Sequence, residues 1–136
     1  MPPALLDTDI LSEFLKQKNP QVLQRAADYL ATYGRFAISA MTWYEVLRGL
    51  KDKSATRQLS QFATFCQNVD VLPITDDILD RASDLWVLGR QGGNPRRDPD
   101  LIIAATALEH GRVLVTGNTP HFAWIPGLTI EDWRQS

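Results

Sequence analysis

The sequence has little of what marks secreted, membrane-bound or disulfide-rich proteins. It contains one cysteine, Cys66, so no disulfide can form within the chain, and a buried free thiol is expected at that position. No apolar run approaches the roughly 20 residues of a membrane-spanning helix. The first residues reach Asp7 and Asp9 without a signal-peptide pattern. These absences predict a cytoplasmic protein with no membrane partner.

The chain also lacks the motifs of several common enzyme classes. It has no Gly-rich phosphate-binding loop. His110 and His121 do not combine with a serine or cysteine at a recognisable spacing, so each is expected to be an ordinary surface or core histidine. With 136 residues, of which 44% are hydrophobic and 22% charged, the composition is that of one globular domain spanning residues 1–136.

The charge balance by itself does not indicate a nucleic-acid-binding protein, because the net charge is −2. Basic residues are nevertheless clustered at two places in the sequence. The first cluster, which follows the start of the motif around Glu45, is Arg48, Lys51 and Lys53. The second cluster, which precedes an Asp-Pro-Asp motif, is Arg90, Arg96 and Arg97. Such clusters either form a mixed solvated surface or provide positive rims beside an acidic pocket.

Short apolar segments alternate with helical patterns along the whole chain. The predicted strands cover residues 3–6, 36–39, 69–74, 112–116 and 128–130, and Pro73 places the third at a strand end or a sheet edge. A helix starting at Thr75 is predicted to bury an apolar face composed of Leu79, Ala82, Leu85, Trp86 and Leu88. This alternation predicts an α/β fold with a mostly parallel sheet.

One predicted helix has no polar face. Asp98 is expected to be its N-cap, Pro99 its first residue, and Asp100 a second carboxylate near the positive end of the helix dipole. Residues 101–108 are apolar on nearly every side, so this helix is predicted to lie inside the protein, with Gly111 ending it.

Acidic and polar residues follow the predicted strands. They are Asp7 and Asp9 after the first, Glu45 in the helix after the second, Asn118 after the fourth, and Asp98 and Asp100 at the mouth of the buried helix. In parallel α/β sheets, ligands bind at the carboxyl ends of the strands. Carboxylates gathered there repel one another unless a cation is present, and hard oxygen ligands suit Mg²⁺ or Mn²⁺.

The same segments resemble PIN-domain ribonucleases of the VapC class, the toxins of type II toxin–antitoxin pairs. The similarity lies in residues 5–11, 39–49, 95–108, 114–122 and 125–133, in this order, and so spans the whole chain. It implies a three-layer α/β/α PIN-like domain whose parallel central sheet has four to five short strands. It also implies a Mg²⁺-dependent endoribonuclease that hydrolyses RNA phosphodiester bonds, with tRNA among the candidate substrates.

The resemblance assigns roles to individual residues. Asp7, Glu45 and Asp100 take the positions of the catalytic acids, and Asp7 and Asp100 those of the metal ligands. The accessory acidic and polar positions are Asp9, Thr42, Asp98, Thr116 and Asn118. The family usually has asparagine at the position of Asp9, and many members have a fourth acid at the position of Asn118. Arg48, Arg96 and Arg97 are predicted RNA contacts by position alone.

The resemblance further implies a VapB-like antitoxin and a homodimer. The apolar faces around Phe14 and Leu15 and around Leu59 and Phe62 either serve such partners or belong to the core. Two alternatives to the nuclease are an interaction domain without catalysis and an aspartate-based phosphatase or receiver domain. Phosphatases and receiver domains of this kind use a lysine late in the chain, whereas no lysine follows Lys53 here.

Overall fold

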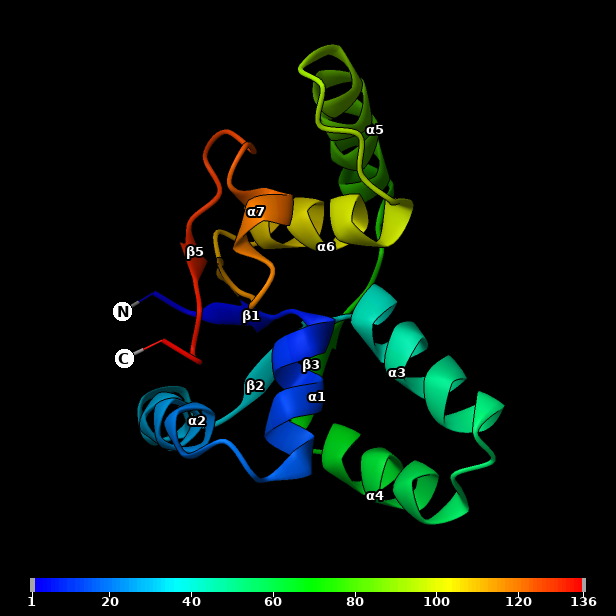
Figure 1. Cartoon of the computed structure of the whole chain (residues 1–136), viewed down its shortest axis with the longest axis vertical. Helices are drawn as coiled ribbons and strands as arrows, with labels where there is room; N and C mark the ends of the chain where they lie inside the picture. The colour runs from blue at the N-terminus through cyan, green and yellow to red at the C-terminus, as the bar shows by residue number, and fades with distance from the viewer. Residues whose placement is uncertain (1, 136) are drawn as a thin grey trace.

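The computed structural model, which describes residues 2–135, contains a twisted set of parallel strands with helices on both sides (Figure 1). The strands are β1 (Ala4–Leu6), β2 (Phe36–Ser39), β3 (Val69–Leu72), β4 (Val113–Val115) and β5 (Ile130–Glu131). Parallel pairing joins β1, β4 and β5 in one group and β2 and β3 in another. Because β1 lies beside β2, the spatial order is β3-β2-β1-β4-β5. The predicted parallel α/β fold is therefore confirmed.

Helices connect and cover these strands. Their bounds are α1 (Thr8–Lys16), α2 (Pro20–Tyr33), α3 (Ala40–Asp52), α4 (Thr56–Cys66), α5 (Asp76–Gln91), α6 (Asp98–Glu109) and α7 (Thr119–Phe122). Within residues 2–135, no helix is both long enough and apolar enough to cross a lipid bilayer.

The two faces of the sheet pack into two separate cores, because successive strand side chains point to opposite sides. In β1, Ala4 and Leu6 join a core formed with α1, α2 and α4, whereas Leu5 joins a core formed with α5, α6 and α7. The alternation makes the domain a three-layer α/β/α structure, as predicted. The partner-groove interpretation is not supported for Phe14 and Phe62, which belong to the first core or pack against it.

The α6 helix is buried, as its sequence predicts: Leu101 is 2% exposed, and residues 103–107 are 1% exposed or less. The prediction that Asp98 is its N-cap is wrong. Arg97 has the extended backbone of an N-cap, and its carbonyl accepts the first helical hydrogen bond, from the Leu101 N–H. Asp98 is thus the first helical residue, where its charge still interacts favourably with the helix dipole. Gly111, with φ of +61°, follows the helix end as predicted.

Two other features differ from the sequence prediction. The predicted α5 face is only partly correct: Leu85 is buried, but Leu79, Trp86 and Leu88 are 42–47% exposed. The α5 helix instead buries Ile78, Ala82, Leu85 and Gly89. The turn expected at residues 117–120 includes the start of α7.

We predict opposite effects of alanine at two helical glycines. A Cβ on Gly89 would lie 2.7 Å from the Asn94 carbonyl oxygen and 2.9 Å from the Trp124 ring, so Gly89→Ala should destabilise the protein by about 1–3 kcal/mol. A Cβ on Gly49 meets no atom within 4 Å, so Gly49→Ala should stabilise it by about 0.5–1 kcal/mol. Urea unfolding measures both, and equal effects of the two variants would contradict this packing.

Candidate active site

Asp7 is the central acid of the site, and it lies where β1 passes into α1. Its carbonyl accepts the first helical hydrogen bond, and its Oδ1 accepts the Thr8 N–H at 2.8 Å, so Asp7 is the N-cap of α1. Thr8 and Asp9 lie inside the first turn of α1 and do not cap it. Asp7 Oδ2 accepts the Thr116 hydroxyl at 2.8 Å. The carboxylate is therefore fixed from two sides and 5% exposed.

The pKa of Asp7 is raised from 3.8 to about 7. Burial is the largest cause, followed by the negative charge of Asp9, with a smaller contribution from Asp100. The hydrogen bonds from Thr116 and Thr8 oppose the shift without cancelling it. The fold thus brings three acids, from the end of β1 and the start of α6, into electrostatic contact.

Asp9 is held beside Asp7 by backbone groups. Its Oδ1 accepts the Ile10 N–H at 2.7 Å, and its Oδ2 accepts the Gly117 N–H at 2.9 Å. Burial raises the pKa of Asp9, although these two hydrogen bonds and the charge of Arg134 lower it. Asp9 therefore adds negative charge next to Asp7, as expected from its replacement of the family's usual asparagine.

Glu45 reaches the site from α3 through hydroxyl groups. The Thr8 hydroxyl donates to Glu45 Oε1 at 2.9 Å and lies 3.2 Å from the hydroxyl of Thr42, which is fully buried. The other carboxylate oxygen of Glu45, Oε2, lies 3.8 Å from Arg48 Nη2 and 4.0 Å from Arg97 Nη2. Glu45 therefore stands between the threonine pair of the pocket and a basic rim.

Asp100 and Asp98 differ in their surroundings. Asp100 is partly buried, contributes to the raised pKa of Asp7, and has its Oδ2 3.3 Å from His121 Nδ1. Asp98 is exposed on the first turn of α6. Of these two acids, Asp100 is therefore the one that interacts electrostatically with Asp7.

The remaining predicted residues lie around the same edge of the sheet. Thr116 hydrogen-bonds Asp7, and its hydroxyl oxygen also accepts the Asn118 N–H at 3.0 Å. Asn118 is itself exposed. Among the arginines, Arg97 is largely exposed, whereas Nε of Arg96 is buried without a hydrogen-bond partner among the described residues.

Three residues of the site were not found from the sequence. Thr8 links Glu45 to the start of α1, His121 Nδ1 lies 3.3 Å from Asp100 Oδ2, and Arg134 donates to the Gly117 carbonyl at 2.7 Å. The Thr-Pro-His segment after Asn118 was a usable signal for His121, because it follows a strand end. No local pattern identifies Arg134, which meets the site only through the fold.

The arrangement suits a divalent cation completed by other ligands. In the described part of the chain, no three His, Cys, Asp or Glu side chains form a ready-made metal-binding group. Mg²⁺ is, however, often bound by one or two carboxylates together with waters and substrate phosphates. Burial and, after it, the negative charges of Asp9 and Asp100 raise the pKa of Asp7, and a bound cation would favour the ionised carboxylate.

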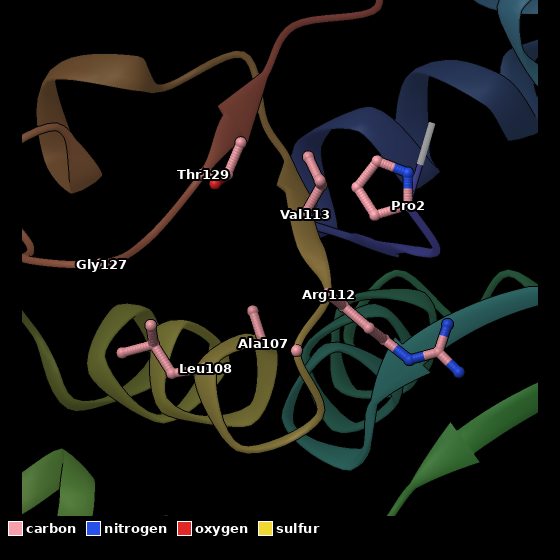
Figure 2. A pocket seen from close by; sticks show the side chains of 8 residues that line it. Pro2, Ala107, Leu108, Arg112, Val113, Gly127 and Thr129 are labelled. Atoms are coloured by element: carbon pink, nitrogen blue, oxygen red, sulfur yellow. The ribbon is translucent and has the colours of Figure 1, made fainter.

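A small cavity of about 170 Å³ is separate from these acids. It is lined by Pro2, Ala107, Leu108, Gly111, Arg112, Val113, Gly127 and Thr129 (Figure 2). Val113 is the first residue of β4, so the cavity lies at the amino ends of the strands. The acids occupy the opposite, carboxyl ends.

A parallel α/β/α domain with acids at the carboxyl ends of its strands is the class defined by this fold and site. The PIN domain family model matches residues 4–123, and the chain belongs to this family.

Characterised relatives cover nearly the whole chain. A tRNA(fMet)-specific endonuclease VapC from Shigella flexneri is 29% identical over 130 residues, which are 95% of this chain and 96% of the relative. A chain in the crystal structure of DNA-bound VapBC from Salmonella typhimurium has a TM-score of 0.85 and 28% identity, covering 98% of this chain and 99% of that one. A toxin–antitoxin complex from Klebsiella pneumoniae gives a TM-score of 0.72 at 31% identity, covering 96% and 97%.

We predict that Thr8 positions Glu45. Thr8→Val keeps the shape of the side chain but removes the hydroxyl, leaving Glu45 Oε1 without its donor. Losing a hydrogen bond to a charged group costs about 1.5–3 kcal/mol, so cleavage under single-turnover conditions should slow by roughly 10- to 100-fold. Thr8→Ser is the matched control and should stay near wild type. Equal activity of the valine and serine variants would exclude the positioning role.

Proposed function

We propose that this protein is the ribonuclease toxin of a VapBC-type toxin–antitoxin pair and that it hydrolyses RNA phosphodiester bonds with a divalent cation. The observation that carries the proposal is the buried carboxylate of Asp7, whose pKa is raised to about 7 beside Asp9 and Asp100 within a PIN domain. A buried carboxylate next to other acids costs stability when it is ionised, and a bound cation offsets that cost.

Asp7 and Asp100 are the proposed ligands of Mg²⁺ or Mn²⁺. When bound, such an ion supplies Lewis acidity toward the scissile phosphate and lowers the pKa of a nearby water. Glu45, held by the Thr8 hydroxyl, is the proposed group that orients the attacking water or shares the ion. Arg48, Arg96 and Arg97 are the proposed phosphate contacts, with support from the positions of Arg48 and Arg97 beside Glu45.

RNA is the proposed substrate and tRNA the proposed class. The support is the name of the Shigella flexneri relative, a tRNA(fMet)-specific endonuclease, together with its coverage of 95% of this chain. An enzyme acting on cellular RNA works in the cytoplasm, which we propose as the location. We also propose that residues 1–136 act as a single nuclease domain.

The test compares wild type with Asp100→Asn on total RNA and on purified tRNA. We expect wild type to cleave with Mg²⁺ or Mn²⁺, to be inactive in EDTA, and to arrest growth when expressed. The Asp100→Asn variant should be folded but inactive and harmless. Equal growth arrest by both proteins, or cleavage that survives EDTA, would reject the metal mechanism and leave the interaction-domain alternative.

A VapB-like antitoxin is the proposed partner. A ribonuclease must be restrained in the cell that makes it, and the structural relatives from Salmonella typhimurium and Klebsiella pneumoniae are toxin–antitoxin complexes. Purification from the native operon should yield a small co-eluting protein that suppresses cleavage. Recovery of the toxin alone from that operon would count against this partner.

We also propose a homodimer that uses exposed apolar residues of α5. Leu79, Trp86, Val87 and Leu88 are each 42–47% exposed on that helix, and apolar surface of this kind is typical of an interface. Light scattering should give twice the chain mass for wild type and the chain mass for Trp86→Glu. A monomeric wild type would reject the dimer.

A further inference from the structure

A large aromatic side chain lies exposed beside the proposed catalytic acid. Tyr44 immediately precedes Glu45 on α3, and 49% of its surface is accessible. The guanidinium carbon of Arg48 lies 5.1 Å from the centre of the Tyr44 ring. The ring is thus held by a cation on α3, while much of its surface remains free to contact a ligand.

The same arginine also belongs to the rim of the acidic site. Arg48 Nη2 is 3.8 Å from Glu45 Oε2, and Arg97 Nη2 approaches the same oxygen at 4.0 Å. The side chains of Arg48 and Arg97 are 50% and 74% exposed, whereas that of Glu45 is 16% exposed. Two guanidinium groups around one carboxylate leave a local positive charge next to the tyrosine ring.

An aromatic ring and two guanidinium groups together match the chemistry of an unpaired nucleotide. The bases of single-stranded RNA stack on tyrosine faces, and arginine forks bind the flanking phosphates. The bases of an RNA duplex are already stacked and paired, so they do not offer a free face to Tyr44. The charge of the rim also favours a polyanion over an apolar protein segment.

We propose that Tyr44 stacks on an unpaired nucleobase next to the scissile phosphate, while Arg48 and Arg97 hold the adjoining backbone. This inference rests on the proposed ribonuclease function and deepens it, because it names the side chain that contacts a base of the substrate beside Glu45. Tyr44 is then a substrate-binding residue that contributes to selection of the cleavage site.

Binding is measured first, in the non-cleaving Asp100→Asn protein. The probes are a short single-stranded oligoribonucleotide that contains 2-aminopurine and the same strand annealed to its complement. Stacking on Tyr44 should quench the 2-aminopurine fluorescence. Adding Tyr44→Ala should weaken single-strand binding by about 5- to 100-fold and abolish the quenching, since a base–aromatic stack contributes that much to affinity. Binding of the duplex should change less than twofold.

Matched variants separate stacking from folding. Tyr44→Phe and Tyr44→Trp keep an aromatic face and should retain the quenching, whereas Tyr44→Leu keeps apolar volume without that face and should lose it. Tyr33→Ala makes the same truncation at another exposed tyrosine, on α2, and should bind RNA like its parent. If Tyr44→Ala does not fold, the leucine and phenylalanine variants decide the question.

Unchanged single-strand binding and quenching in both Tyr44→Ala and Tyr44→Leu would overturn the proposal. Unchanged RNA binding together with loss of antitoxin binding would also overturn it, since Tyr44 would then be a protein-contact residue. If wild type cleaves RNA and the Tyr44→Leu variant has the same kcat/KM, the stacking proposal is refuted and the ribonuclease function is not. A wild type that cleaves no RNA with Mg²⁺ or Mn²⁺ refutes the ribonuclease function instead.

Discussion

Replacing Asp7 with asparagine is expected to lower metal-dependent RNA cleavage by about 10³-fold or more. The amide preserves the shape of the side chain, and its oxygen can still accept the Thr8 N–H. It removes the buried negative charge that we propose as a cation ligand. Lewis-acid stabilisation by such an ion is worth several kcal/mol, and each 1.36 kcal/mol corresponds to a factor of ten in rate.

The cleavage rates are measured under single-turnover conditions over a range of Mg²⁺ concentrations. If the variant has only lost affinity for the cation, its rate should recover at high Mg²⁺ concentration. Asp77→Asn, at an exposed position in the first turn of α5, is the matched control and should cleave like wild type. Asp98→Asn should lose less than tenfold, because its carboxylate is exposed. An Asp7→Asn protein within tenfold of wild type at every Mg²⁺ concentration would refute the assignment of Asp7.

The same Asp7→Asn change should stabilise the metal-free protein at pH 8, by as much as about 4 kcal/mol. Folding raises the pKa of this carboxyl from 3.8 to about 7, so the folded state binds more protons than the unfolded state between these values. The free energy of unfolding therefore falls as the pH rises from about 4 to 7, and the loss is complete above pH 7. Asparagine has no such titration.

Urea unfolding in EDTA at several pH values from 4 to 8 tests this expectation. The difference in unfolding free energy, Asp7→Asn minus wild type, should increase with pH and level off above about pH 7. Adding Mg²⁺ at pH 8 should stabilise wild type more than the variant, since binding requires the ionised carboxylate. A difference that is independent of pH would mean that Asp7 is not strained by burial and by its acidic neighbours.

Much of the fold was predictable from local pattern. The short apolar strands and the apolar residues 101–108 of α6 are encoded in contiguous residues, and their burial follows from composition alone. Pro20 opening α2 and Gly111 following α6 are likewise local conformational preferences. The exposed residues of α5 were not predictable in the same way. Trp86 and Leu88 satisfy helical periodicity but lie outside the core, and the Arg90 guanidinium lies over the Trp86 ring.

The site was predictable as a set of acids but not as a set of contacts. Asp7 and Asp100 are recognisable because they occupy a strand end and a helix start, and Glu45 because it lies in the motif that resembles the PIN-domain ribonucleases. Thr8 and Arg134 are not, since their roles arise from contacts with residues far away in sequence: Thr8 with Glu45 on α3, and Arg134 with Gly117 after β4.

The sequence by itself determined the α/β class and the buried α6, since these depend on periodicity and residue type, and it predicted the acids of the site through the resemblance to PIN-domain ribonucleases. Only the tertiary structure decided that Asp7 is an N-cap with a pKa raised to about 7, and that Tyr44 lies exposed beside a basic rim. The physical reason is that burial and Coulomb interactions depend on distances in space. Those distances are set by packing between segments as far apart as residues 7 and 116.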